Sequence, residues 1–218
     1  NPLHQQSHNM RFYDFQPAPS PRRVRMFIAE KGIDIPSVAV DLRNGEHLQP
    51  EFLAVNPFAT VPVLELDDGT RLTTTAGCRA YIESAHPTPS LLGSNAAECG
   101  RIADLIWYIE FNGIMAIAEC LRNSAKGMRD RALPGTVNYA QITELAERGR
   151  SRAGRFFEVL DDLIGDDPFL NGERLSAADI DAFVFVEFAK WIKAETPANC
   201  DRVINWHQRM AERPSADL

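Results

Sequence analysis

Cysteine is scarce in this chain of 218 residues, and the four that occur stand alone. They show no C-x-x-C pair and no cluster with histidine at the spacing of zinc ligands, so we expect neither a metal site nor a dithiol centre. Long apolar runs are lacking too, because no stretch approaches the roughly 20 residues of a membrane helix. No charged-then-apolar leader opens the chain. We therefore expect a cytoplasmic protein without a membrane partner.

Basic charge is also in deficit, with 23 Lys and Arg against 30 Asp and Glu and a net charge of -7. A polyanion binder would need a strong local basic patch against that background, so we expect no nucleic-acid partner. Hydrophobic residues make up 44% and charged residues 24%, which is ordinary usage for a compact globular protein. Residues 1–9 are polar and unpatterned, and we interpret them as a leader or a remnant of expression.

The first third of the chain predicts a strand–helix–strand unit. Residues 10–15 have strand character, and the prolines of residues 16–19 end that strand. Ser20 fits the N-cap of a helix with Pro21 at its first position, and Gly32 fits its end. Residues 37–41 then form a second strand, which a right-handed crossover places parallel to the first.

A hairpin and a further helix complete this domain. The expected elements are a helical turn at 50–53, a strand at 61–66, a turn at 67–69, a returning strand at 70–73 and a helix from Thr75, as its cap, to about residue 84. The order β-α-β followed by β-β-α is typical of a thioredoxin-like α/β domain.

Every clear periodic segment after a proline-rich stretch is helical. The expected helices span about 95–123, 138–165, 177–192 and 200–212. We therefore divide the chain into a thioredoxin-like domain at 10–85, a linker at 86–94 and an all-α domain at 95–218.

Three motifs in this order resemble the cytosolic glutathione transferases, in particular the bacterial, theta-like branch. They are residues 20–32 (SPRRVRMFIAEKG), residues 45–64 (GEHLQPEFLAVNPFATVPVL) and residues 169–180 (FLNGERLSAADI). The resemblance runs from Met10 to about Ala211. It implies a homodimer that uses glutathione as co-substrate, with no metal, and attacks a small hydrophobic electrophile with the glutathione thiolate, as in detoxification.

The thiol needs help to ionise, since a free thiol has a pKa near 8.5. A helix N-terminus with a hydroxyl donor supplies that help, and Ser20 has this place. By the family pattern the catalytic serine or cysteine would fall at Ala18, which has no hydroxyl. Either Ser20 or backbone amides near Ala18 must therefore act on the sulfur. The alternative is that Ser20 only caps the helix and that Arg22 and Arg23 are solvated or pair with surface carboxylates.

The resemblance implies further contacts with glutathione. Val61 and Pro62 are similar to the family's cis-proline motif, in which the main chain before the proline pairs with the cysteinyl part of glutathione. Thr74 and Thr75 stand where most members have Glu-Ser, at a helix start that takes the γ-glutamyl carboxylate. Thr74 lacks the usual carboxylate. Each residue also has a purely structural interpretation, as an edge-strand proline or as an ordinary cap.

His47 matches a histidine that contacts the glycine carboxylate in the theta-like branch, although a lone loop histidine is often simply solvated. Gln49 is a neighbouring donor with less support. Thr60 falls where some relatives have lysine, so that contact is expected to be missing.

The electrophile pocket is expected on the first long helix of the second domain. Tyr108, Phe111, Asn112 and Met115 recur at the spacing of one helix face. In the family this helix lines the pocket and part of the dimer interface, and the alternative is plain bundle core. Trp191 is a further pocket candidate. The segment 176–179 (SAAD) reads as a capping box with a structural role only.

Other functions remain open at this level. A thiol–disulfide oxidoreductase is disfavoured, because no cysteine lies at the first helix. A non-catalytic binding or regulatory protein is favoured by Ala18 and Thr74, whereas His47, Val61 and Thr75 favour an intact glutathione site. A glutathione-dependent isomerase or dehalogenase is also compatible with the sequence.

Overall fold

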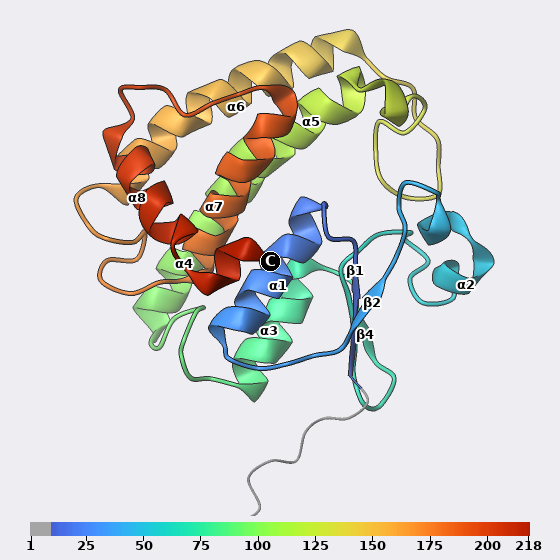
Figure 1. Cartoon of the computed structure of the whole chain (residues 1–218), viewed down its shortest axis with the longest axis horizontal. Coiled ribbons are helices and arrows are strands. Elements are labelled where there is room, and N and C mark those ends of the chain that lie inside the picture. Colours follow the sequence, from blue (N-terminus) through green and yellow to red (C-terminus); the bar gives the residue numbers. More distant parts are fainter. Residues whose placement is uncertain (1–9) are drawn as a thin grey trace, which may run out of the picture.

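The computed structural model describes residues 10–218, so the expected leader at residues 1–9 lies outside the described residues. Figure 1 shows a small sheet flanked by helices, joined to a larger group of helices. The order of the elements in the first part is β1 (Arg11–Asp14), α1 (Pro19–Glu30), β2 (Ser37–Ala39), α2 (Pro50–Leu53), β3 (Val63–Glu65), β4 (Arg71–Leu72) and α3 (Thr75–Ala85).

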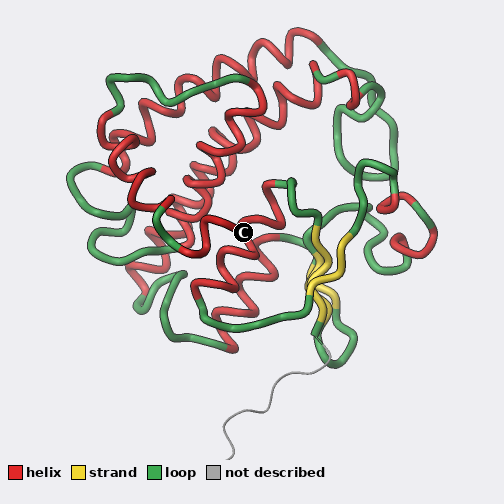
Figure 2. The backbone as a smooth tube through the Cα atoms, viewed as in Figure 1, coloured by secondary structure: helices red, strands yellow, loops and turns green. Residues whose placement is uncertain are grey.

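The four strands form one sheet in the order β2-β1-β3-β4. β1 runs parallel to β2 and antiparallel to β3, where Tyr13 lies opposite Val63. β3 and β4 form the expected antiparallel hairpin. Figure 2 shows how short these strands are beside the helices that pack on them. The predicted β-α-β and β-β-α order is confirmed, and each strand ends within a few residues of its expected limits.

The second part of the chain is helical, as predicted. Its helices are α4 (Ala96–Tyr108), α5 (Met115–Ser124), α6 (Thr143–Ile164), α7 (Ala177–Ala189) and α8 (Asp201–Ala211). α4 and α5 are joined by a π-helical segment, Ile109–Ile114, so they run on as one long helix. The expected domain boundary at 86–94 falls in the stretch between α3 and α4.

The start of α6 differs from the prediction, which placed it at residue 138. Residues 129–141 instead form a loop, in which Arg131 and Tyr139 make a short bridge. The side chain of Gln141 donates to the carbonyl oxygens of Arg122 and Ala125 at 3.0 and 2.7 Å, which ties this loop to the end of α5. These tertiary bonds hold the segment out of a helix.

Two helix caps also lie one or two residues from where they were expected. Ala18 is the N-cap of α1, and Ser20 is already inside the helix, so Ser20 is not a cap. Thr74 caps α3 by accepting a hydrogen bond from the Gly77 amide at 2.9 Å, whereas Thr75 is the first helical residue.

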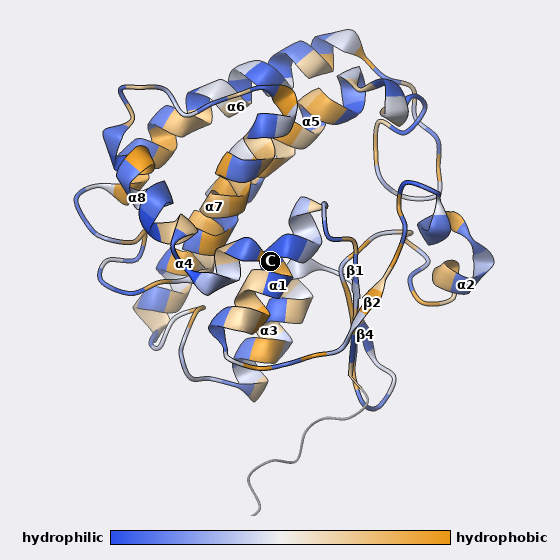
Figure 3. Cartoon of the chain, viewed as in Figure 1, coloured by the Kyte–Doolittle hydropathy of each residue, from blue (hydrophilic) through white to orange (hydrophobic). Residues whose placement is uncertain are grey.

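α7 forms the centre of the molecule, and its side chains are buried on nearly every side. Figure 3 shows that hydrophobic residues predominate along this helix. One continuous apolar cluster joins Phe27 of α1 and Ile82 of α3 to Phe185 of α7 and Trp206 of α8. A capping box of Ser176 and Asp179 begins α7, as the sequence indicates. The two parts of the chain thus share a core, and that core fixes the N-terminal end of α1 relative to the helical part.

None of the helices in residues 10–218 is both long enough and apolar enough to cross a lipid bilayer.

Candidate active site at the start of α1

The first turn of α1 offers one free backbone donor. A helix leaves its first N–H groups without acceptors inside the helix. Here the Ala18 N–H donates to the Phe15 carbonyl at 2.9 Å, and Pro19 and Pro21 have no N–H. The Ser20 amide is therefore the donor that remains at the positive end of the helix dipole.

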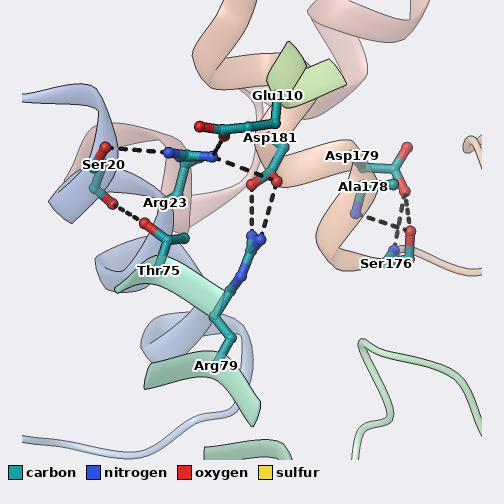
Figure 4. Close-up of polar contacts among 9 residues, drawn as sticks. All are labelled: Ser20, Arg23, Thr75, Arg79, Glu110, Ser176, Ala178, Asp179 and Asp181. Atoms are coloured by element: carbon teal, nitrogen blue, oxygen red, sulfur yellow. Dashed lines mark hydrogen bonds and ion pairs between the residues drawn. The ribbon is translucent and has the colours of Figure 1, made fainter. Parts of the chain in front are cut away.

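The Ser20 side chain adds a second donor at the same place. Its Oγ accepts a hydrogen bond from Arg23 Nη2 at 3.1 Å, and a hydroxyl that accepts one bond keeps its own hydrogen for another partner. The Ser20 carbonyl lies 3.5 Å from the Thr75 hydroxyl (Figure 4). The starts of α1 and α3 are thus in contact, and this contact brings Ser20 and Thr75 together.

Arg23 belongs to a buried network of charges between the two parts of the chain (Figure 4). Only 3% of Arg23 is exposed, and its guanidinium pairs with Glu110 and lies 3.7 Å from Asp181. Arg79 binds both carboxylate oxygens of Asp181, at 2.5 and 3.0 Å. The alternative that Arg23 is solvated is therefore wrong, because the interface between the helices encloses it, whereas its partner Glu110 is 38% exposed.

Arg22 has a different neighbourhood. Its guanidinium donates to the carbonyl of Ala216 at 2.9 Å and lies 5.4 Å from the centre of the Phe183 ring. It is half-buried and forms no ion pair within residues 10–218. Arg22 connects α1 to the last residues of the chain. The alternative that Arg22 is solvated is therefore also wrong.

The Val61–Pro62 peptide bond is cis. Because Tyr13 is opposite Val63, Val61 lies two residues further along, beside the loop that leads from β1 into α1. Asn56 holds this turn in place, since its side chain donates to the Thr60 carbonyl at 2.8 Å. The Val61 backbone is thereby placed at the same end of the sheet as Ser20.

His47 lies in a short 3-10 helix, Glu46–Leu48, after β2. It is half-buried, and its Nδ1 is enclosed without a hydrogen-bond partner. Burial lowers the pKa of His47, and the positive charges of Arg131 and Arg122 lower it further. The imidazole is therefore neutral at pH 7. Gln49 is exposed at the start of α2.

The expected electrophile face points outward. The side chains of Tyr108, Phe111 and Met115 are 47%, 52% and 46% exposed, and Asn112 is half-buried. The alternative that these residues are bundle core is wrong for the three large ones. The π-helical segment contains Phe111 and Asn112, and Trp107 stacks on Phe111 with 5.0 Å between the ring centres.

A cavity of about 210 Å³ borders the loop between β1 and α1. The walls come from that loop, α1, α7 and the turn after α7, namely Pro17, Pro19, Arg22, Val184, Glu187, Phe188, Lys190 and Trp191. Trp191, a pocket candidate from the sequence, is therefore at a cavity next to the start of α1. The four residues of the outward face do not line it.

The cysteines take no part in this site. Cys78, Cys120 and Cys200 are buried and Cys99 is exposed, all as free thiols. Burial raises the pKa of the Cys78 thiol to about 12, so this sulfur does not ionise at neutral pH. Within residues 10–218 no group of three His, Cys, Asp or Glu side chains is placed to hold a metal ion.

A thioredoxin-like sheet with a cis-proline beside a helix start, followed by an all-α part, defines the class of two-domain thiol-handling proteins. The family signature described as "Glutathione S-transferase, N-terminal domain" matches residues 18–85, and the C-terminal signature matches residues 137–216. "Glutathione S-transferase 2" of Saccharomyces cerevisiae is 33% identical over 208 residues, which cover 94% of this chain and 87% of that protein. The chain belongs to the glutathione S-transferase family.

Two further comparisons agree with this assignment. "Maleylacetoacetate isomerase" of Pseudomonas aeruginosa is 40% identical over 178 residues, 78% of this chain and 77% of that protein. The crystal structure of Gtt2 from Saccharomyces cerevisiae superposes with a TM-score of 0.86 at 32% identity, and the match covers 95% of this chain and 98% of that one. The expected fold class and family are confirmed.

Sequence reasoning missed several residues near the site. Glu110, Asp181 and Arg79 are far apart in the sequence, and no local pattern indicates that they meet Arg23. Arg122, at the end of α5, and Arg131, in the loop that folds back after it, both lie near His47. Neither position carries a local signal that relates it to His47, so the sequence offers no means of finding them.

Proposed function

We propose that the protein joins the thiolate of reduced glutathione to a small hydrophobic electrophile. The observation that carries this proposal is the position of Ser20, whose amide and hydroxyl are both available as donors at the positive end of α1. Two donors and a helix dipole favour the thiolate over the thiol. The thiolate attacks the electrophilic carbon, a C–S bond forms, the leaving group departs with its electron pair, and the thiol proton goes to solvent.

The rest of the tripeptide fits the surrounding elements. The γ-glutamyl carboxylate would lie at the start of α3, where the Thr75 amide has no acceptor inside the helix. The cysteinyl backbone would pair with the main chain of Val61, and the glycine carboxylate would extend toward His47. Thr74 uses its hydroxyl as a cap, so it contributes to this site by fixing the start of α3.

The electrophile would occupy the cavity beside Trp191 and Pro19, next to the Ser20 end of α1. Its walls combine apolar carbon with the charges of Arg22, Glu187 and Lys190, which suits a small apolar molecule with one polar group. Tyr108, Phe111, Asn112 and Met115 do not line this cavity, and we assign them to the second role that the sequence indicates for their helix, the dimer interface.

A homodimer is part of the proposal. Trp107, Tyr108, Phe111 and Met115 form an outward apolar face, and a second copy of the chain would bury it. Changing Phe111→Glu should convert the dimer into a monomer in light scattering coupled to size exclusion. A wild-type chain that is monomeric at micromolar concentration contradicts the dimer. Free thiols also fit a reducing compartment such as the cytoplasm.

Calorimetry with glutathione, followed by conjugation of a generic aryl halide, tests the function. We expect glutathione to bind and the conjugate to form. Binding without turnover would indicate a non-catalytic binding protein, and the absence of both would reject the proposal. Glutathione-dependent consumption of maleylacetoacetate without a conjugate would indicate an isomerase instead.

A further inference from the structure

Three nitrogen-bearing side chains from the two parts of the chain are neighbours, because the positive charges of Arg131 and Arg122 lower the pKa of His47. His47 comes from the turn after β2, Arg122 from the last turn of α5, and Arg131 from the loop that follows α5. In Figure 1 this loop lies beside α2 and the segment after β2. A Cβ on Gly135 in the loop would lie 3.8 Å from the Phe58 carbonyl, which confirms that the two segments are in contact.

The two arginines are held in place by neutral groups. Arg122 Nη1 donates to the Arg131 carbonyl at 2.9 Å, and Arg131 Nη2 donates to the Gly135 carbonyl at 2.7 Å. Arg131 Nη1 also reaches the side-chain oxygen of Asn138 at 3.3 Å. Both arginines are half-buried. Their guanidinium groups are therefore oriented by the fold and are not free to move away from one another.

Neither arginine has a carboxylate to balance its charge. Among the described residues 10–218, no Asp or Glu forms an ion pair with Arg122 or Arg131. Burial and the charge of Arg131 lower the pKa of Arg122, which shows that the two like charges interact. In a chain of net charge -7, this is an unbalanced positive site beside a neutral His47 with an enclosed, unpartnered Nδ1.

We propose that Arg122 and Arg131 of the helical domain bind the glycine carboxylate of glutathione together with His47. This inference rests on the proposed function and extends the site across both domains. With the γ-glutamyl end at α3 and the cysteinyl backbone at Val61, the remaining end of the tripeptide is a carboxylate. Guanidinium groups are the side chains best suited to a carboxylate, because their N–H donors match its two oxygens.

The arrangement has a consequence for specificity. A thiol compound that lacks the terminal carboxylate leaves two half-buried guanidinium groups without an anion. Such a compound binds more weakly, even if its thiol and γ-glutamyl group are unchanged. The arginines therefore select the complete tripeptide over γ-glutamylcysteine, whose own carboxylate ends one residue short of them, and over compounds with a blocked C-terminus.

Calorimetry with two ligands tests this inference. The ligands are glutathione and its C-terminal amide, in which the glycine carboxylate is replaced by a neutral group. The variants are Arg122→Gln and Arg131→Gln, and the matched control is Arg129→Gln, an exposed arginine of the same loop. We expect each test variant to bind glutathione roughly tenfold more weakly, the size of a lost charge-assisted hydrogen bond. Their affinity for the amide should equal that of the wild type.

The amide also reports on folding, because a variant that binds it normally has an intact site. If a variant loses affinity equally for both ligands, or loses no affinity for glutathione, the role of the arginines is overturned. In those cases, wild-type binding and conjugation would leave the proposed function standing. A wild-type protein that binds neither ligand would contradict the function as well. The Arg129→Gln variant should match the wild type throughout.

Discussion

Arg23 and Ser20 lie one helical turn apart on α1, and the Arg23 guanidinium donates to Ser20 Oγ at 3.1 Å. The same guanidinium pairs with Glu110 on the other side of the domain interface. The side chain that orients the Ser20 hydroxyl is thus fixed by the second domain. Loss of the contact between Arg23 and Glu110 should affect both the stability of the protein and the chemistry at Ser20.

Arg23→Met should lower the free energy of unfolding by about 3 kcal/mol, because it leaves Glu110 without its partner and removes one cation from the buried Asp181. Urea unfolding measures this loss. Arg174→Met is the control, since Arg174 pairs with Glu98 at the surface and such pairs contribute little. Equal stability of the two variants would mean that the buried network does not hold the domains together.

Trp191→Ala should raise KM for an apolar electrophile several-fold and leave KM for glutathione unchanged, because Trp191 lines the cavity and neither His47 nor any residue of α3 does. Steady-state kinetics with each substrate varied in turn separates the two constants. Val159→Ala shortens an exposed apolar side chain of α6 that does not line the cavity, and it should leave the electrophile KM as it is. An unchanged electrophile KM in Trp191→Ala, or an equal rise in both variants, would contradict this place for the pocket.

Protonation of Glu187 should make the protein less stable in acid. A hydrogen bond from His207, with Lys190 nearby, lowers the Glu187 pKa from 4.5 to about 2. Because the folded pKa is below the unfolded one, the stabilisation is complete above pH 4.5 and is lost as the pH falls toward about 2. Water reaches the pair, so we expect a loss of only about 1 kcal/mol.

The comparison with Glu187→Gln isolates this contribution. Urea unfolding measures the free energy of unfolding at neutral pH and at about pH 3. Between these two conditions the wild type should lose about 1 kcal/mol more of this free energy than the variant does. Identical losses would mean that the Glu187 pair does not contribute to acid sensitivity.

The order of secondary structure could be predicted because strong local signals mark it. The prolines after residue 15, Gly32 and the turn at residues 67–69 end or reverse elements in any context. The cap of α1 was misplaced because Pro19 and Pro21 both satisfy the rule for a first helical proline. Thr74 and Thr75 present the same ambiguity, since either hydroxyl could cap α3.

The site could be predicted only in part. The family pattern led to Ala18, Val61 and Thr75, and the expected helix start led to Ser20; the fold brings these to one end of the sheet. The Asp181 carboxylate that Arg23 and Arg79 share is buried between elements far apart in the chain, and tertiary packing alone creates it. The same holds for Arg122 and Arg131.

The central claim is that Ser20 and the start of α1 keep the sulfur of bound glutathione ionised. Titration of the thiolate absorbance of glutathione bound to the wild type, to Ser20→Ala and to Ser20→Thr tests it directly. We predict a thiol pKa at least one unit below the free value of about 8.5 in the wild type and in Ser20→Thr, and a higher one in Ser20→Ala. A bound thiol that titrates like free glutathione in the wild type would contradict the account.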